Sequence, residues 1–151
     1  MSAKTLYERT RQFTVPPLRD SSGASAIEFA LVAPVLIVLA VGILVYGLYF
    51  GTAHSVQQLA ADAARASVAG LSDTERTSIA RTHVTTNATS YPLIAPDKIT
   101  VAAGPLDADA NQFEVTVEYD ASELPIFGLD QLVPVPSPTI RRTSTIRRGG
   151  Y

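Results

Sequence analysis

The sequence has no cysteine and only two histidines among its 151 residues. The lack of cysteine excludes disulfide scaffolds, thiolate zinc sites, iron–sulfur clusters and cysteine nucleophiles. His54 and His83 stand far apart in the sequence, which argues against a histidine-rich metal or acid–base site. There is also no long basic run, and the formal net charge is −2, which argues against nucleic acid as a main partner. We expect no catalytic residue, metal, cofactor or small-molecule substrate.

Charge is missing from one long block, because no Asp, Glu, Lys or Arg lies between Glu28 and Asp62. Within it, residues 29–51 read FALVAPVLIVLAVGILVYGLYFG, which as a helix would span roughly 35 Å. The run is apolar on all sides, and the remaining chain of about 90 residues is too small to surround it. We therefore predict a transmembrane helix. A buried helix of an oligomer and a secretory signal cleaved after Ala53 are the alternatives.

The charges that flank the span predict its orientation. Four basic residues precede it: Lys4, Arg9, Arg11 and Arg19. The first basic residue after it is Arg65. Because positive charge marks the cytoplasmic side, we expect a cytoplasmic N-terminus and export of the chain beyond about residue 53. Tyr46 and Tyr49 near the far end suit an interfacial aromatic belt.

A short motif stands at the cytoplasmic edge of the span. Gly23 and the small residues after it offer an unhindered peptide bond to a membrane-embedded protease. Glu28 lies where the helix enters hydrocarbon, and a carboxylate there is costly unless it is protonated or paired. The simpler alternative is a glutamate that reaches back to water and a glycine that ends a flexible tail.

Gly23, Glu28 and Phe29 before an apolar helix resemble the processing motif of type IV prepilins. More narrowly, residues 28–34 (EFALVAP) resemble the TadE-like pseudopilins of the tight-adherence (Tad/Flp) pilus system, and residues 60–66 (AADAARA) resemble the helix that follows the span in that family. The resemblance implies that a prepilin peptidase cuts between Gly23 and Ala24. It also implies that Glu28 pairs with the new terminal amine of a neighbouring subunit.

Three residues of the span predict local features. Pro34 lacks a backbone donor, so we expect a kink or loosening between Glu28 and Pro34. Gly47 and Gly51 form a small-xxx-small pattern that would let another helix approach closely. Past the span, alanine-rich residues 52–70 predict that the helix continues until Gly70 ends it.

The exported part changes from helical to strand periodicity. Ser72 to Glu75 reads as a capping box that opens a second helix to about Asn87. Alternation predicts strands at 99–101 and 113–119, joined as an antiparallel hairpin by turn residues 104–111. It also predicts a third strand at 139–147 with Ile140 and Ile146 on one face. Residues 124–132 should form a covering loop or short helix.

These elements predict an α+β fold: a long N-terminal transmembrane helix followed by a small exported domain of helix and antiparallel sheet, as in pilin-like proteins. The predicted parts are a cytoplasmic leader (1–23), a processing region and transmembrane helix (24–53), exported helices (54–90) and a small sheet domain (91–151).

Charge is uneven along the exported part. Residues 62–140 hold eleven acidic and four basic residues, whereas four arginines gather at the end: Arg141, Arg142, Arg147 and Arg148. These arginines either dock on an acidic face of the same or a neighbouring subunit, or form a soluble tail. Asp107 and Asp109 lack the spacing of a calcium loop, and His83 is expected to be exposed.

The sequence thus predicts a TadE-like minor pseudopilin that takes part in assembling or priming a Tad/Flp adhesive pilus. It would be a non-enzymatic, single-pass protein of the bacterial inner membrane with a periplasmic or extracellular domain. Its expected partners are the prepilin peptidase, other minor pseudopilins, the pilus assembly machinery and the lipid bilayer. The alternatives are an unprocessed membrane-tethered scaffold and an anchored hydrolase or metal-binding domain that uses the acidic residues at 107–123.

Overall fold

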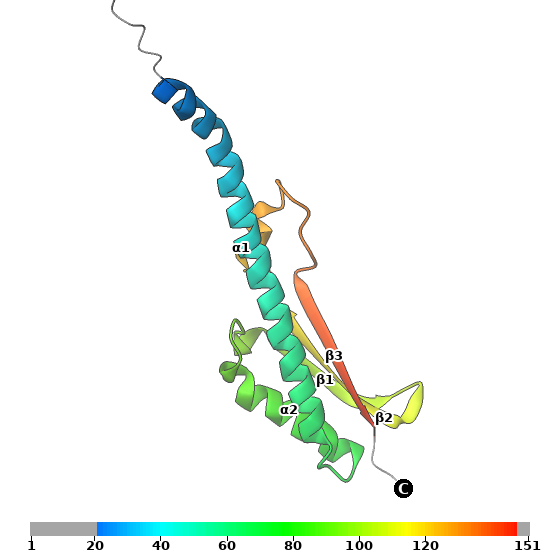
Figure 1. Ribbon diagram of the computed structural model, residues 1–151. Coiled ribbons are helices and arrows are strands. Elements are labelled where there is room, and N and C mark those ends of the chain that lie inside the picture. The colour runs from blue at the N-terminus through cyan, green and yellow to red at the C-terminus, as the bar shows by residue number, and fades with distance from the viewer. Residues whose placement is uncertain (1–20, 148–151) are drawn as a thin grey trace, which may run out of the picture. The chain divides into compact units, whose positions relative to one another are not determined.

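The computed structural model describes residues 21–147 (Figure 1). The chain divides into two compact units, Met1–Ile37 and Val38–Tyr151, with the boundary inside the first helix. The longer elements are two helices and three strands: α1 (Ser21–Ser67), α2 (Asp73–Asn87), β1 (Ile99–Leu106), β2 (Asp109–Asp120) and β3 (Thr139–Arg147). Short 3-10 helices are η1 (Ala88–Ser90), η2 (Pro96–Lys98) and η3 (Pro125–Leu129). The α+β class predicted from the sequence is confirmed, whereas residues 1–20 of the predicted leader and Arg148 lie outside the described residues.

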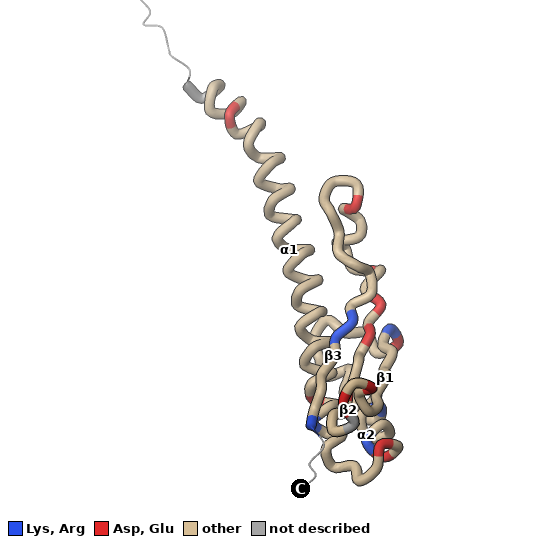
Figure 2. Tube along the Cα trace, turned by 90° about the vertical axis from the view of Figure 1, so that its right-hand side faces the viewer, with Lys and Arg blue, Asp and Glu red and all other residues tan. Residues whose placement is uncertain are grey.

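The first half of α1 presents apolar side chains to its surroundings. Large residues from Ile27 to Leu44 are 41–72 % exposed, and the helix is long and apolar enough to cross a membrane. After Glu28, residues 29–44 carry no charge, and this part of α1 is tan throughout in Figure 2. α1 continues through Pro34 as helix, because the ring removes only one hydrogen bond of the ladder. The kink at Pro34 stays a prediction.

From Val45 onward, one face of α1 turns into the core of the second unit. Val56 and Leu59 are fully buried, and so are three small residues on the same helix: Ala60, Ala63 and Ala64. Alanine keeps the helix surface thin, so the backbone of α1 can lie close to the residues that cover it. These alanines belong to the same hydrophobic core as Val115 and Val117 of the sheet.

The turn between α1 and α2 is built on Gly70, but for a different reason from the one predicted. No glycine among the described residues has a positive φ. A Cβ atom at Gly70 would instead lie 2.8 Å from the backbone nitrogen of Arg76. Gly70 therefore permits a close approach of α2 to the turn and supplies no left-handed cap.

Ser72 caps α2 as the sequence predicts. The backbone N–H of Glu75 donates to Ser72 Oγ at 3.2 Å. The Glu75 carboxylate accepts from the N–H of Leu71 at 2.8 Å, one residue before the donor of an ordinary capping box. Both contacts satisfy amides at the helix start, and α2 ends at Asn87 where expected.

The sheet has the order β1-β2-β3 and is antiparallel throughout. The central strand β2 buries alternate side chains, which are Phe113, Val115 and Val117. On β3, Ile140 is buried and Ile146 is partly buried on the same face, as predicted. Ala102, Thr116 and Thr143 stand in one row across the opposite face.

The predicted turn at 104–111 was too long. Gly104 and Pro105 belong to β1, where Pro105 stands opposite Phe113, and a register shift follows before Leu106 pairs with Asp109. Proline is tolerated there because β1 is an edge strand. No further strand pairs with the outer side of β1, so a missing N–H costs no hydrogen bond on that side. The turn itself is only Asp107 and Ala108.

The segment from Leu124 to Pro138, which we call the η3–β3 segment, runs beside α1. Its η3 helix buries Ile126 completely. The hydroxyl of Tyr46 donates to the carbonyl of Pro134, and that of Tyr49 donates to the carbonyl of Ser137 at 3.2 Å. Tyr46 and Tyr49 therefore hold this segment against the helix, and their place at a membrane interface stays a prediction.

Candidate processing site and subunit-contact surfaces

Gly23 and Ala24 lie in the first turn of α1, and both are exposed. Nothing stands within 4 Å of the position that a Cβ atom on Gly23 would take. The first amides of a helix have no partner in the helix, so this turn opens at little cost. The Gly23–Ala24 peptide bond is thus accessible to another protein.

Glu28 and Phe29 follow one to two turns later on the same helix, and both are exposed, Phe29 by 70 %. Within residues 21–147, no basic side chain forms an ion pair with Glu28. A partner from another chain would therefore meet no competing ion pair among these residues.

The two glycines of the small-xxx-small pattern differ in their surroundings. Gly47 has open space where a side chain would be. A Cβ atom at Gly51 would come within 2.9 Å of Leu93 Cδ1, and Leu93 itself adopts a left-handed backbone with φ of 64°. Gly51 thus makes room for a side chain of its own domain, while Gly47 stays accessible to another helix.

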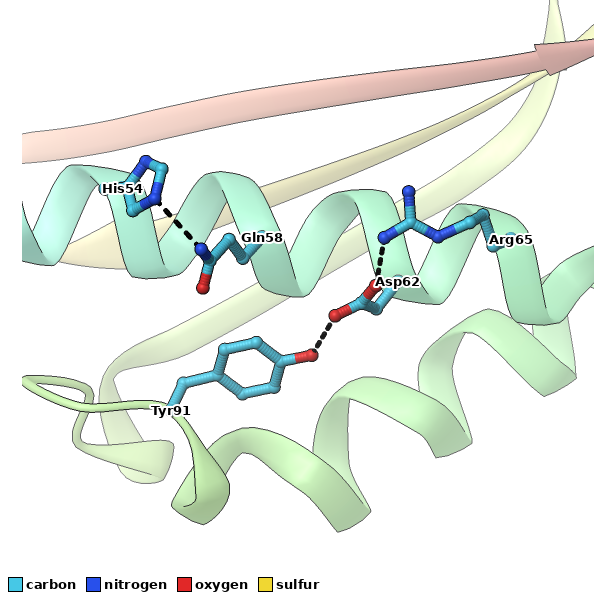
Figure 3. Close-up of polar contacts among 5 residues, drawn as sticks. All are labelled: His54, Gln58, Asp62, Arg65 and Tyr91. Atoms are coloured by element: carbon cyan, nitrogen blue, oxygen red, sulfur yellow. Dashed lines mark hydrogen bonds and ion pairs between the residues drawn. The ribbon is translucent and has the colours of Figure 1, made fainter.

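A cluster of polar side chains that no local sequence pattern predicts lies where α1 faces the chain between η1 and β1 (Figure 3). Asp62 Oδ2 accepts a hydrogen bond of 2.5 Å from the hydroxyl of Tyr91, and Asp62 Oδ1 pairs with Arg65. One and two turns earlier, His54 and Gln58 are joined by a hydrogen bond of 2.9 Å. The spacing of Asp62 and Arg65 could have suggested their pairing, but nothing near Tyr91 in the sequence signals its contact.

The ionisation of the two central groups follows from these bonds. The hydrogen bond from Tyr91, followed by that from Arg65, lowers the pKa of Asp62. Burial and then the hydrogen bond to Asp62 raise the pKa of Tyr91 to about 12. The carboxylate and the protonated phenol are thus the favoured pair over the physiological range, and they tie α1 to the chain that follows η1.

Tyr91→Phe is expected to lower the free energy of unfolding at pH 7 by about 1 kcal/mol, since it removes one hydrogen bond and keeps the ring. An unfolded tyrosine ionises near pH 10, whereas Tyr91 keeps its proton until about pH 12. The unfolded chain therefore binds fewer protons in that window, and stability falls as pH rises. Urea unfolding of the detergent-solubilised chain should show the wild-type advantage shrinking between pH 10 and 12. A constant difference across that window would contradict the contact.

The basic end of the chain is partly neutralised within the sheet. Arg141 forms an ion pair of 2.5 Å with Glu118, which stands directly opposite it on β2. Arg142 Nη1 donates to the carbonyl of Arg141 at 2.9 Å, and Arg147 is exposed at the end of β3. The ion pair of Arg141 joins two neighbouring strands, and the docking of the basic end on an acidic face stays a prediction. Arg147 keeps its charge on the surface.

His83 is not simply exposed, as predicted, but half-buried. Its Nε2 atom is shielded from solvent and has no hydrogen-bond partner among the described residues. The side chain lines a shallow groove of about 370 Å³ between Ala66 of α1 and one face of α2. The prediction failed because the helix periodicity of α2 did not show which face α1 would cover. Within residues 21–147, no group of three acidic or histidine side chains is placed to hold a metal ion.

A single long apolar helix that continues into a small α+β domain defines the protein as pilin-like in arrangement. Residues 23–65 match the family described as TadE-like protein. Neither the curated proteins nor the solved structures gave a match. The resemblance predicted from the sequence is confirmed over residues 23–65, whereas α2 and the sheet lie outside the match.

Proposed function

We propose that the protein is a minor pseudopilin of a Tad/Flp-type pilus that takes part in its assembly or priming for adhesion. The family match and the apolar N-terminal helix together suggest a Tad pilus component. The observation that carries the proposal is where the match starts: its first residue is Gly23, directly before the proposed cut. The part of the chain that precedes the cut is the basic leader, whose role would be to set topology.

Cleavage after Gly23 would give a new amine at Ala24, four residues before Glu28. The domain covers α1 from Val45 onward, which leaves sixteen residues, 29–44, between Glu28 and the covered helix. A helix needs about 20 residues to cross the hydrocarbon. Glu28 would therefore lie within the apolar layer, where pairing with the amine of a neighbouring subunit offsets the cost of burying both charges.

The proposal places the protein in the bacterial inner membrane in a single pass, with the exported domain on the far side. Its helix would contact lipid and the helices of other minor pseudopilins, with Gly47 as an accessible close-approach point. The prepilin peptidase would act on the chain, and no catalytic step is assigned to the chain itself. The surface charge of Arg147 is available to other subunits or to the assembly machinery.

Mass spectrometry of the membrane-extracted protein, expressed with and without a prepilin peptidase, tests the proposal. We expect a product that starts at Ala24 only when the peptidase is present. An unchanged N-terminus in both cases would favour the unprocessed scaffold and contradict the pseudopilin. Cleavage after Ala53 would instead identify a secretory signal, and bound metal or turnover would support the anchored enzyme.

A further inference from the structure

The η3–β3 segment, residues 124–138, has an unusual composition for an exposed connection. It reads LPIFGLDQLVPVPSP and contains one charged residue, Asp130. Ile126 anchors one end in the core, whereas Leu132 in the middle is 73 % exposed. In Figures 1 and 2 the segment extends past the ends of the strands, alongside α1. A large apolar side chain is thus presented away from the core by a nearly uncharged segment.

The segment is fastened to α1 directly beside its lipid-facing surface. Tyr46 donates to the carbonyl of Pro134, and Ile43 and Leu44, within the preceding turn, are 67 % and 64 % exposed. Tyrosines favour the membrane interface, where the ring is in apolar surroundings and the hydroxyl meets a polar group. If residues up to Leu44 face hydrocarbon, the carbonyl held by Tyr46 lies at headgroup level.

The backbone of the segment is suited to that position. Four prolines carry no N–H group, at positions 125, 134, 136 and 138. The N–H groups of Leu132 and Val133 both donate to the carbonyl of Leu129, at 2.9 and 3.0 Å. Few backbone donors therefore lose a partner when water is displaced, which is the main cost of moving irregular chain toward lipid.

We propose that the η3–β3 segment is a second membrane-contacting element, which inserts Leu132 into the headgroup region of the bilayer next to the transmembrane helix. The exposed carboxylate of Asp130, two residues away, limits the insertion to a shallow depth. The segment has no basic residue, so the occupant is the apolar part of the lipid surface and not an anionic headgroup. The inference rests on the proposed membrane span of α1.

Because the chain has no cysteine, single cysteines can be labelled without altering other positions. Leu132→Cys is compared with two exposed controls, Ile37→Cys in the proposed span and Thr145→Cys on the open face of β3. Each full-length variant carries an environment-sensitive fluorophore and is reconstituted in phosphatidylcholine vesicles with or without lipid that bears a nitroxide near the top of the acyl chain. We expect strong quenching at positions 37 and 132, at least threefold greater than at position 145.

Each failure has its own pattern. Quenching at position 132 equal to that at 145, with position 37 still quenched, would overturn the inference and leave the span intact. A blue-shifted but unquenched label at position 132 would place protein over Leu132, such as a second copy, and would also overturn it. An unquenched label at position 37 would overturn the membrane span, and the inference with it.

Discussion

Gly23→Leu is expected to abolish the cleavage that we propose after residue 23. A prepilin peptidase that requires a small residue before the cut cannot accept leucine, and leucine also strengthens the first turn of α1 by about 1 kcal/mol relative to glycine. The fold itself should be unaffected, because a side chain at Gly23 meets open space. Mass spectrometry of the membrane-extracted variant should find only the uncut chain. Urea unfolding of the α+β domain should match that of the wild type, because Gly23 lies outside the unit Val38–Tyr151.

Two further variants separate the reasons for that loss. Gly23→Ala adds helix propensity with the smallest side chain, so a partial loss of cleavage would measure the contribution of helix opening. Ala26→Leu places the same large residue at another exposed position of the same helix and should be cut normally. Normal cleavage of Gly23→Leu after residue 23 would show that the glycine is not recognised, against the processing motif.

Glu28→Ala is expected to spare cleavage and to reduce the recovery of co-purifying pilus subunits at least tenfold, which corresponds to a coupling of about 1.4 kcal/mol. The sign of the effect distinguishes two roles for the carboxylate. If Glu28 only reaches back to water, alanine makes the helix more apolar and recovery of the complex stays equal or rises. If Glu28 pairs with the amine of a neighbouring Ala24, alanine leaves that amine uncompensated and recovery falls.

Glu28→Gln is the matched control, because it removes the charge and keeps the shape and length of the side chain. We expect Glu28→Gln to lose the complex nearly as strongly as Glu28→Ala, with recovery measured by affinity purification from the same detergent extract. Full recovery with glutamine would assign the effect to packing and contradict the ion pair. Within residues 21–147, Glu28 has no ion pair of its own to lose, so neither variant should change the stability of the α+β domain.

The elements that the sequence predicted well depend on nearby residues. Ser72 and the helix it caps, the alternation of β2 and the Ile140–Ile146 face of β3 all follow from spacings of two to four residues, which local geometry enforces. The hairpin turn was misjudged because Gly104 and Pro105 are turn residues by preference. Their pairing with β2 is a property of the sheet, and it overrode that preference.

The residues of the candidate site also fall into two groups, those that local sequence predicted and those that only the folded chain brings together. Gly23, Glu28 and Phe29 form a local motif, so residue types and spacing were sufficient to find them. The contact of Asp62 with Tyr91 joins residues 29 positions apart, and the ion pair of Arg141 with Glu118 crosses two strands. Neither partner could be named before the chain was folded, because no local pattern links them.

The sequence by itself determined that the chain has a charge-free segment long enough for a membrane-spanning helix, four basic residues before it and no cysteine. These properties follow from composition along one segment and need no knowledge of its neighbours. Only the tertiary structure decided which residues of that apolar run pack into the core of the domain and which stay exposed on the helix. Val45 and Tyr49 turn into the core of the domain and Leu44 does not, because Tyr46 and Tyr49 each bond to carbonyls 88 residues further along the chain.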